Sequence, residues 1–241
     1  GVSFEFRFKA IESHKGYWDK AFIVGSYTAT FFQGVSLGAF INGFKIVSDG
    51  PNLLFSGGSF DWFTPFSCFT GLGLLAAYAL LGCTWLIIKT ENQLQQQMIN
   101  MTKPILYLLL LFIIGVSVWT PLTHEVISKR WFSLPNVFFL APFPLIAFAS
   151  AYFLLKKLKQ NPHIAPFLLT LVIIFSGYLG LAFSLWPNIL PNISMREVAA
   201  PEQSMGFALV GALFIIPFIL MYTSWSYYVF RGKITSTEGY H

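Results

Sequence analysis

The densest group of ionisable side chains lies near the start of the sequence. Together with one tryptophan, it comprises Glu5, Arg7, Lys9, Glu12, Trp18 and Asp19. Carboxylates next to basic groups can form a proton-entry site or pair with charges on another subunit. The same residue types also fit an ordinary solvated segment beside a membrane span, in which the charges serve only to set topology. Spacing alone leaves both interpretations open.

Other residues that could do chemistry are isolated. The histidines all lie in predicted loops or near the chain ends: His14, His124, His163 and His241. Haem requires axial ligands, usually on helices that face the inside of a bundle. Met205 and Met221 are ligand types, but a lone methionine in an apolar helix usually serves packing. We therefore expect this chain to bind no haem, other cofactor or metal by itself.

The two cysteines do not form a redox pair. Cys68 and Cys83 lie fifteen residues apart in one apolar stretch. A straight helix would separate them by roughly 22 Å, which is too far for a disulfide. Phosphate-binding glycine loops, paired catalytic carboxylates and Ser/His/Asp sets are also missing. The sequence therefore does not indicate an enzyme that is catalytic alone.

Membrane helices must position these residues. The chain of 241 residues is 55% hydrophobic and only 10% charged, and its mean hydropathy is +0.64. Such a chain cannot cover a water-soluble surface. Runs of about twenty apolar residues recur, each long enough to cross a bilayer as a helix. They predict an all-α, polytopic bundle of six transmembrane helices at 21–44, 63–88, 104–122, 137–155, 164–186 and 205–230.

The distribution of charge argues against an ion-coupled transporter and predicts the orientation of the chain in the membrane. None of the six predicted spans contains Asp, Glu, Lys, Arg or His, whereas ion-coupled transporters normally carry such a residue near the membrane midplane. The net charge of +5 comes from basic residues between the spans, so no nucleic-acid partner is expected. Eleven of the fifteen Lys and Arg residues fall on the side of the two chain ends. Both ends are therefore predicted to be cytoplasmic.

Local signals mark several boundaries. Thr64 and Pro65 suit the cap and first turn of a helix, and Lys103 with Pro104 is predicted to open the third span similarly. The segments 45–62 and 187–204 are rich in Pro, Gly, Asn and Ser and predict ordered outer loops. Residues 34–38 form a GxxxG pattern, which allows close helix packing within this bundle or at a subunit interface. The whole chain, 1–241, is predicted to be one transmembrane domain.

Four stretches, in order along the chain, resemble subunit II of cytochrome bd-type quinol oxidases, particularly the cyanide-insensitive branch. They are GVSFEFRFKA with YWD at 17–19, FDWFTPFSCFTGLGLLAAYALLGCTWLIIKTENQLQ at 60–95, SLWPNILPNISMREVAAPEQSMGF at 184–207 and IPFILMYTSWSYYVFRGKIT at 216–235. Members of this family have eight transmembrane helices. The chain resembles such a protein without its first two helices.

The resemblance implies a place in the respiratory chain of a bacterial inner membrane. The partner, subunit I, is expected to hold haem b and haem d, oxidise quinol and reduce oxygen to water. Subunit II is expected to be free of haem, to stabilise subunit I, and to assist proton delivery or hold a quinone. Membrane lipid and a small accessory subunit are further expected partners.

The resemblance also assigns roles to single residues. Glu5 and Asp19 are expected near a proton-access surface or subunit interface, with Arg7 pairing an acid and Trp18 beside it. Structural roles are expected for the other matched residues: Asp61, Trp62, Pro65, Arg231 and Lys233. The outer loop 187–204 carries Arg196-Glu197 and Pro201-Glu202 where relatives often have less charge, so its function stays open.

Two other functions remain as alternatives. A small multi-helix transporter would purify without haem and without a partner. A membrane assembly factor would bind haem proteins only transiently, so a stable complex with quinol oxidase activity would exclude it.

Overall fold

The computed structural model describes residues 2–49, 52–160, 163–190 and 193–233. The helices in these ranges are α1 (Val2–Lys9), α2 (Glu12–Asn42), α3 (Pro65–Lys89), α4 (Asn92–Thr123), α5 (Glu125–Phe132), α6 (Asn136–Leu140), α7 (Pro142–Leu158), α8 (Ala165–Leu185) and α9 (Glu202–Val229). Two short antiparallel hairpins, β1 (Ile46–Asp49) with β2 (Asn52–Phe55) and β3 (Asn188–Leu190) with β4 (Ile193–Ser194), lie within the segments predicted as ordered loops.

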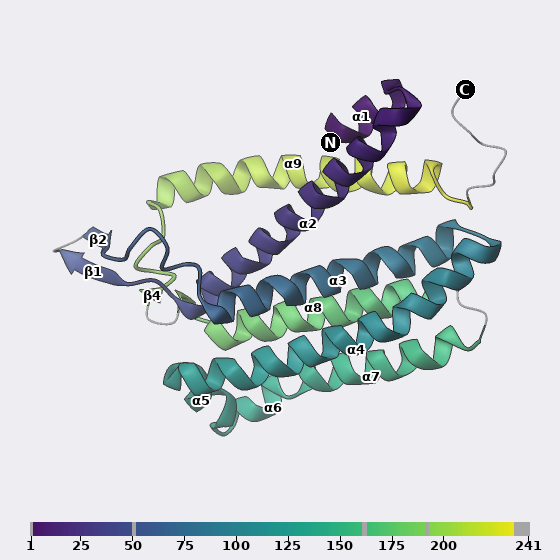
Figure 1. Cartoon of the computed structure of the whole chain (residues 1–241). Coiled ribbons are helices and arrows are strands. Elements are labelled where there is room, and N and C mark those ends of the chain that lie inside the picture. Colours follow the sequence, from purple (N-terminus) through teal and green to yellow (C-terminus); the bar gives the residue numbers. More distant parts are fainter. Residues whose placement is uncertain (1, 50–51, 161–162, 191–192, 234–241) are drawn as a thin grey trace.

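The core lies between four helices, α3, α4, α7 and α8, which run side by side (Figure 1). Each contributes a fully buried aliphatic side chain: Leu80, Leu106, Leu154 and Ile173. Lipid tails are as apolar as these side chains, so close packing holds membrane helices together more than escape from water does. We call the end of the bundle that carries β1 and β2 the hairpin end, and the opposite end the α3–α4 end.

Helix α2 crosses the bundle at a steep tilt and contacts it through its second half (Figure 1). A Cβ atom at Gly34 would lie 2.7 Å from the backbone of Gly71, and one at Gly38 would lie 2.6 Å from the backbone of Ser67. Only glycine permits this approach. The GxxxG pattern therefore serves packing of α2 on α3 within the chain.

Buried polar side chains among the described residues are all serine or threonine. Most donate their hydroxyl proton to a backbone carbonyl of their own helix, as Thr84 does to Leu80 at 2.9 Å and Thr102 to Met98 at 2.7 Å. Every buried side-chain nitrogen or oxygen in the described ranges has a partner. The interior thus satisfies its polar groups without any charge.

Five of the six predicted spans coincide with helices that are long and apolar enough to cross a membrane. These are Pro65–Lys89, Asn92–Thr123, Asn136–Leu158, Ala165–Leu185 and Glu202–Val229. The predicted first span, 21–44, overlaps α2 as far as Asn42, but this helix of 31 residues falls outside the set. Polar residues recur along α2, including Ser26, Thr28 and Gln33, and they lower its hydropathy. The described part of the chain therefore contains five helices that meet the criteria for a membrane span, against the six spans predicted from the sequence.

Helix boundaries agree with the sequence at one proline and differ at another. Thr64 and Ser67 form a reciprocal capping box at the start of α3, and Pro65 takes the first helical position, as predicted. Pro104 was expected to open its span, but α4 already begins at Asn92 and continues through Pro104. The residues before Pro104 are polar yet include good helix formers, notably glutamine, so the helix extends well beyond its apolar part.

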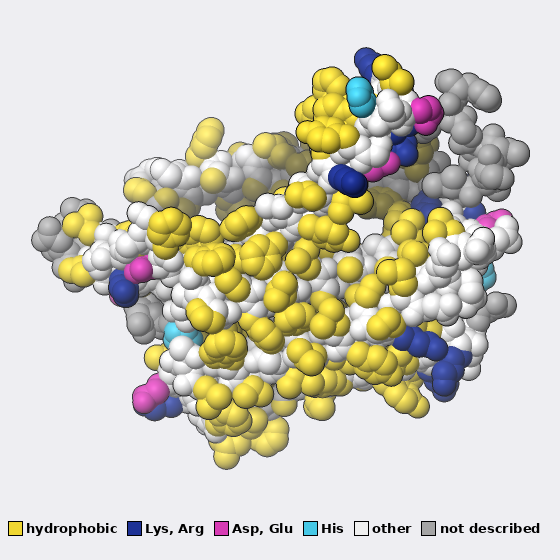
Figure 2. All heavy atoms as spheres, in the orientation of Figure 1, with side chains coloured by type: hydrophobic (Ala, Val, Ile, Leu, Met, Phe, Trp, Pro, Cys, Tyr) yellow, Lys and Arg dark blue, Asp and Glu magenta, His cyan; other side chains and the backbone are white. Residues whose placement is uncertain are grey.

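Hydrophobic side chains cover the length of the bundle, and charged side chains gather at its two ends (Figure 2). Helix α9 is extreme in this respect, because none of its residues is buried although it is as apolar as α4. It runs along the bundle with few close contacts to the other helices (Figure 1).

Candidate functional site

The polar residues near the start of the chain meet at the corner between α1 and α2. The Nε atom of Arg7 on α1 donates a hydrogen bond to Oδ1 of Asp19 on α2. The ring of Phe6 stacks on Trp18 with centroids 5.1 Å apart. The Arg7 and Asp19 side chains are 42% and 45% exposed, so the pair is accessible to solvent and not buried. The structure therefore places Arg7, Trp18 and Asp19 at one corner of the chain.

Glu5 and Glu12 lie apart from this pair. Glu5 is exposed on α1, and no ion pair joins it to another residue in the described ranges. Glu12 pairs with Lys15 one turn along α2, and the hydrogen bond from Lys15 lowers the pKa of Glu12 below its usual value. Glu12 therefore favours the carboxylate form more than an unpaired glutamate does.

Lys89 and Lys233 tie the end of α9 to the bundle at the α3–α4 end, whereas Arg231 packs on α9 itself. Lys89, at the end of α3, donates hydrogen bonds to the carbonyls of Phe230 and Gly232. Lys233 pairs with Glu91 at 3.5 Å, and the guanidinium of Arg231 lies 4.0 Å from the ring centre of Tyr228. Lys89 and Glu91 were not singled out in the sequence, because only the fold places them beside the tail.

At the hairpin end, the FDW-x-TP motif forms the approach to α3. The indole N–H of Trp62 donates to the carbonyl of Ser59 at 2.8 Å. Asp61 pairs with Lys45, Oδ2 to Nζ at 3.2 Å, across the hairpin of β1 and β2. The hydrogen bond from Lys45 and a second one from the Gly58 backbone lower the pKa of Asp61 below its ordinary value. Asp61 therefore fastens the hairpin to the start of α3.

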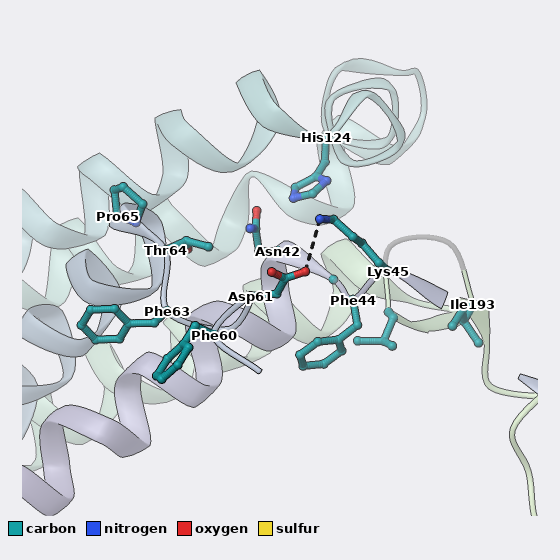
Figure 3. A pocket seen from close by; sticks show the side chains of 12 residues that line it. Asn42, Phe44, Lys45, Phe60, Asp61, Phe63, Thr64, Pro65, His124 and Ile193 are labelled. Atoms are coloured by element: carbon teal, nitrogen blue, oxygen red, sulfur yellow. Dashed lines mark ion pairs between the residues drawn. The ribbon is translucent and has the colours of Figure 1, made fainter. Parts of the chain in front are cut away.

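This ion pair lines a cavity of about 530 Å³ (Figure 3). Its walls come from the end of α2, the start of α3, the α4–α5 junction and the hairpin of β3 and β4. His124 joins the wall from the α4–α5 junction, and partial burial lowers the pKa of its imidazole. This arrangement was not predicted from the sequence, because the cavity residues lie far apart along the chain.

The outer loop 187–204 contains a small polar turn before α9. The backbone N–H of Ser194 donates to Oε2 of Glu197 at 2.8 Å, and α9 then begins at Glu202. Within the part of the chain that the structure describes, no three His, Cys, Asp or Glu side chains gather as a metal site would require. The candidate sites are thus a charged corner, a tail anchor and a polar cavity.

Comparisons with known proteins give a consistent result. A family model described as cytochrome bd terminal oxidase subunit II matches residues 1–230. Cytochrome bd-I ubiquinol oxidase subunit 2 of Escherichia coli (strain K12) is 19% identical over 269 residues, covering 98% of this chain and 71% of the relative. Cytochrome bd ubiquinol oxidase subunit 2 of Bacillus subtilis (strain 168) is 22% identical over 253 residues, covering 99% and 70%.

Proposed function

Because this chain belongs to the cytochrome bd terminal oxidase subunit II family, we propose that it is the haem-free subunit of a bacterial quinol oxidase. In this role the chain stabilises the haem-bearing subunit I and does not oxidise quinol or reduce oxygen by itself. Haem b and haem d belong to the partner. The family membership weighs against the transporter alternative.

The exposure of α9 is the observation that carries this proposal. Ser204, Ala208 and Ala212 recur every four residues and therefore share one face of α9. Small residues at this spacing let a second helix approach closely in a membrane. A Cβ atom at Gly206 or Gly211 would meet nothing within 4 Å in this chain. Helix α9 thus offers a packing face that its own bundle leaves open, and subunit I is its proposed occupant.

The first half of α2 extends this proposed interface. Phe22, Ile23 and Tyr27 are all exposed, and a Cβ atom at Gly25 would meet no other atom within 4 Å. The 31 residues of α2 exceed the length needed to span the hydrocarbon layer. We infer that α2 is a sixth span, whose intermittent polar residues are tolerated because protein rather than lipid covers them.

Haem ligation by this chain has little support in its geometry. His14 lies at the exposed start of α2, His124 at the junction of α4 and α5, and His163 in the connection before α8. None of the three lies within a candidate span. The two methionines considered as ligands, Met205 and Met221, are both exposed on α9. We assign the haems to the partner on the strength of the family membership; His241 lies outside the described residues.

Proton access is the second proposed role. Helix α1, which carries Glu5 and Arg7, lies toward the α3–α4 end (Figure 1), where α3 ends at Lys89 and α7 ends just after Lys156 and Lys157. The gathering of basic residues at one end supports a cytoplasmic assignment for this end, and for both chain ends. Exposed carboxylates there can collect protons from the cytoplasm for reduction of oxygen in the partner.

A quinone or lipid tail also has a candidate place in the chain. An apolar groove of about 200 Å³ lies between α2, α3, α4 and α8. Leu37, Leu74, Phe112 and Ile173 are among its lining residues. We propose that an isoprenoid or acyl chain occupies this groove in a structural role.

The test is a reduced-minus-oxidised visible spectrum of the tagged chain, purified in mild detergent, with a gel of co-purifying proteins. Bands of haem b and haem d together with a larger polypeptide are expected. A colourless single chain would contradict the proposal and favour the transporter.

Photo-cross-linking tests the interface separately. Benzoylphenylalanine in place of Ile215, which is 59% exposed and lies on the same face of α9 as Ala208 and Ala212, should cross-link to the haem-bearing polypeptide. The same group in place of Phe153, 50% exposed on α7, is the matched control and should not cross-link. Cross-links from position 153 alone would place the partner against α7 and would contradict the proposed interface on α9.

A further inference from the structure

The cavity at the hairpin end lies at the depth where lipid headgroups are found. Two of its walls are the ends of membrane-spanning helices, because α3 begins its span at Pro65 and α4 ends its span at Thr123, next to His124. A cavity at this level is open to the headgroup of a phospholipid whose acyl chains lie along the helices. Figure 3 shows its lining residues at the hairpin end.

The cavity offers both signs of charge side by side. The Lys45 side chain is 75% exposed and the Asp61 side chain 37% exposed, although their charged atoms are 3.2 Å apart. Each group therefore keeps hydrogen-bonding positions that the ion pair does not use. Lys45 can still donate to a phosphate, and Asp61 can still accept from an ammonium group.

An apolar rim adjoins these charges. Phe44, Phe60 and Phe63 line the same cavity and are 40%, 79% and 49% exposed. Aromatic rings that contact water on one side and apolar groups on the other are typical of the membrane interface. They provide a surface for the glycerol and the first methylenes of a lipid, next to the site for its headgroup.

We propose that this cavity binds a phosphatidylethanolamine-type phospholipid. Its phosphate pairs with Lys45, its ammonium donates hydrogen bonds to Asp61, and its glycerol end rests on Phe60 and Phe63. A choline headgroup has no N–H to donate to Asp61, and a glycerol headgroup has no positive charge. The proposal does not depend on the oxidase function, because it uses only residues at the hairpin end.

The site is tested on the purified, delipidated complex by native mass spectrometry during titration with lipids of identical acyl chains. Phosphatidylethanolamine is expected to bind one site at least about tenfold more tightly than phosphatidylcholine or phosphatidylglycerol. Equal binding of phosphatidylglycerol would overturn the zwitterionic assignment in favour of a site for phosphate alone. This comparison uses the unaltered protein, so it does not depend on any variant folding.

Variants then locate the site. Lys45→Gln and Asp61→Asn should each weaken phosphatidylethanolamine binding about tenfold, and Asp61→Asn should abolish the preference over phosphatidylglycerol. Lys129→Gln and Glu125→Gln are matched controls, because Lys129 and Glu125 form an exposed ion pair at 3.2 Å outside the cavity. Equal losses in the control variants would show that surface charge, and not this cavity, attracts the lipid.

A soluble headgroup distinguishes the source of the ligand. Millimolar phosphoethanolamine should not displace the lipid, because it lacks the apolar part that contacts the rim. Displacement at concentrations close to those of the lipid would show that the site takes a free phosphate ester. The haem spectrum of the same samples reports the oxidase assembly separately, so failure of the lipid site and failure of the proposed function give different results.

Discussion

The hydroxyl of Thr70 on α3 donates a hydrogen bond to the backbone carbonyl of Gly34 on α2, at 2.9 Å. A side-chain donor reaches a neighbouring helix's backbone only when the two helices are in close contact. Gly34 and Gly38 permit that contact, because neither has a side chain to hold α2 away. This seam is what attaches the tilted α2 to the rest of the bundle.

The seam predicts that Gly38→Ala lowers stability. The added Cβ would lie 2.0 Å from the Thr70 hydroxyl and 2.6 Å from the Ser67 backbone, so α2 would have to move. Overpacking of this kind costs about 1–3 kcal/mol. Thermal unfolding of the purified complex should therefore begin at a lower temperature.

Gly82→Ala is the matched control on α3, the other helix of this seam. Its Cβ would meet nothing within 4 Å, and alanine favours a helix over glycine by about 1 kcal/mol. Its unfolding temperature should stay the same or rise slightly. Equal losses for the two variants would show that helix packing at Gly38 is not the cause.

The anchor at the α3–α4 end predicts that Lys89→Gln loosens the end of α9. Lys89 donates to two carbonyls of the tail, and these exposed, charge-assisted bonds contribute about 1 kcal/mol. Tryptic cleavage after Arg231 should accelerate about fivefold, in proportion to the opened population. Lys103→Gln removes an exposed lysine of α4 as a control, and its cleavage rate should not change.

The sequence predicted the parts of the fold that depend on local patterns. The start of α3 follows from Thr64 and Pro65, because a capping residue followed by proline acts within one turn. The start of α4 could not be found in this way. Hydropathy marks the edge of the membrane rather than the end of the helix, and the polar turns before Pro104 remain helical.

Contacts between distant segments were not predictable. The approach of Lys45 to Asp61 requires the β1–β2 hairpin to fold back on the start of α3. His124 reaches the same cavity through the junction of α4 and α5. Neither approach leaves a periodic or spacing signal in the sequence. By contrast, Arg7 and Asp19 are joined by one turn between two helices, so their proximity was within reach of sequence reasoning.

The charged corner predicts a defect in proton delivery. Glu5→Gln and Asp19→Asn remove carboxylates at the proposed entry surface, so quinol-driven oxygen uptake per haem should fall by up to roughly tenfold, equivalent to about 1.4 kcal/mol. The defect should grow as the pH rises, because protons become scarcer while the haem content stays unchanged. Glu125→Gln serves as the control, because it removes an exposed carboxylate of α5 at the hairpin end, away from the charged corner. A loss of assembled complex without a change in rate per haem would assign the corner a structural role instead.

The Lys45–Asp61 pair predicts a pH dependence of stability. The pKa of Asp61 is lowered below its ordinary value of 3.8 by the hydrogen bond from Lys45, so the folded state favours the carboxylate. The stabilisation is therefore fully present above pH 3.8 and is lost as the pH falls through the lowered folded value. Asp61→Asn should unfold at a slightly lower temperature than the wild type at pH 7, and this gap should close as the solution is acidified. Titration of His124, whose pKa is also lowered, occurs in both proteins and cancels in the difference. A gap that is constant down to the most acidic condition would mean that Asp61 acts through its shape or hydrogen bonding and not through its charge.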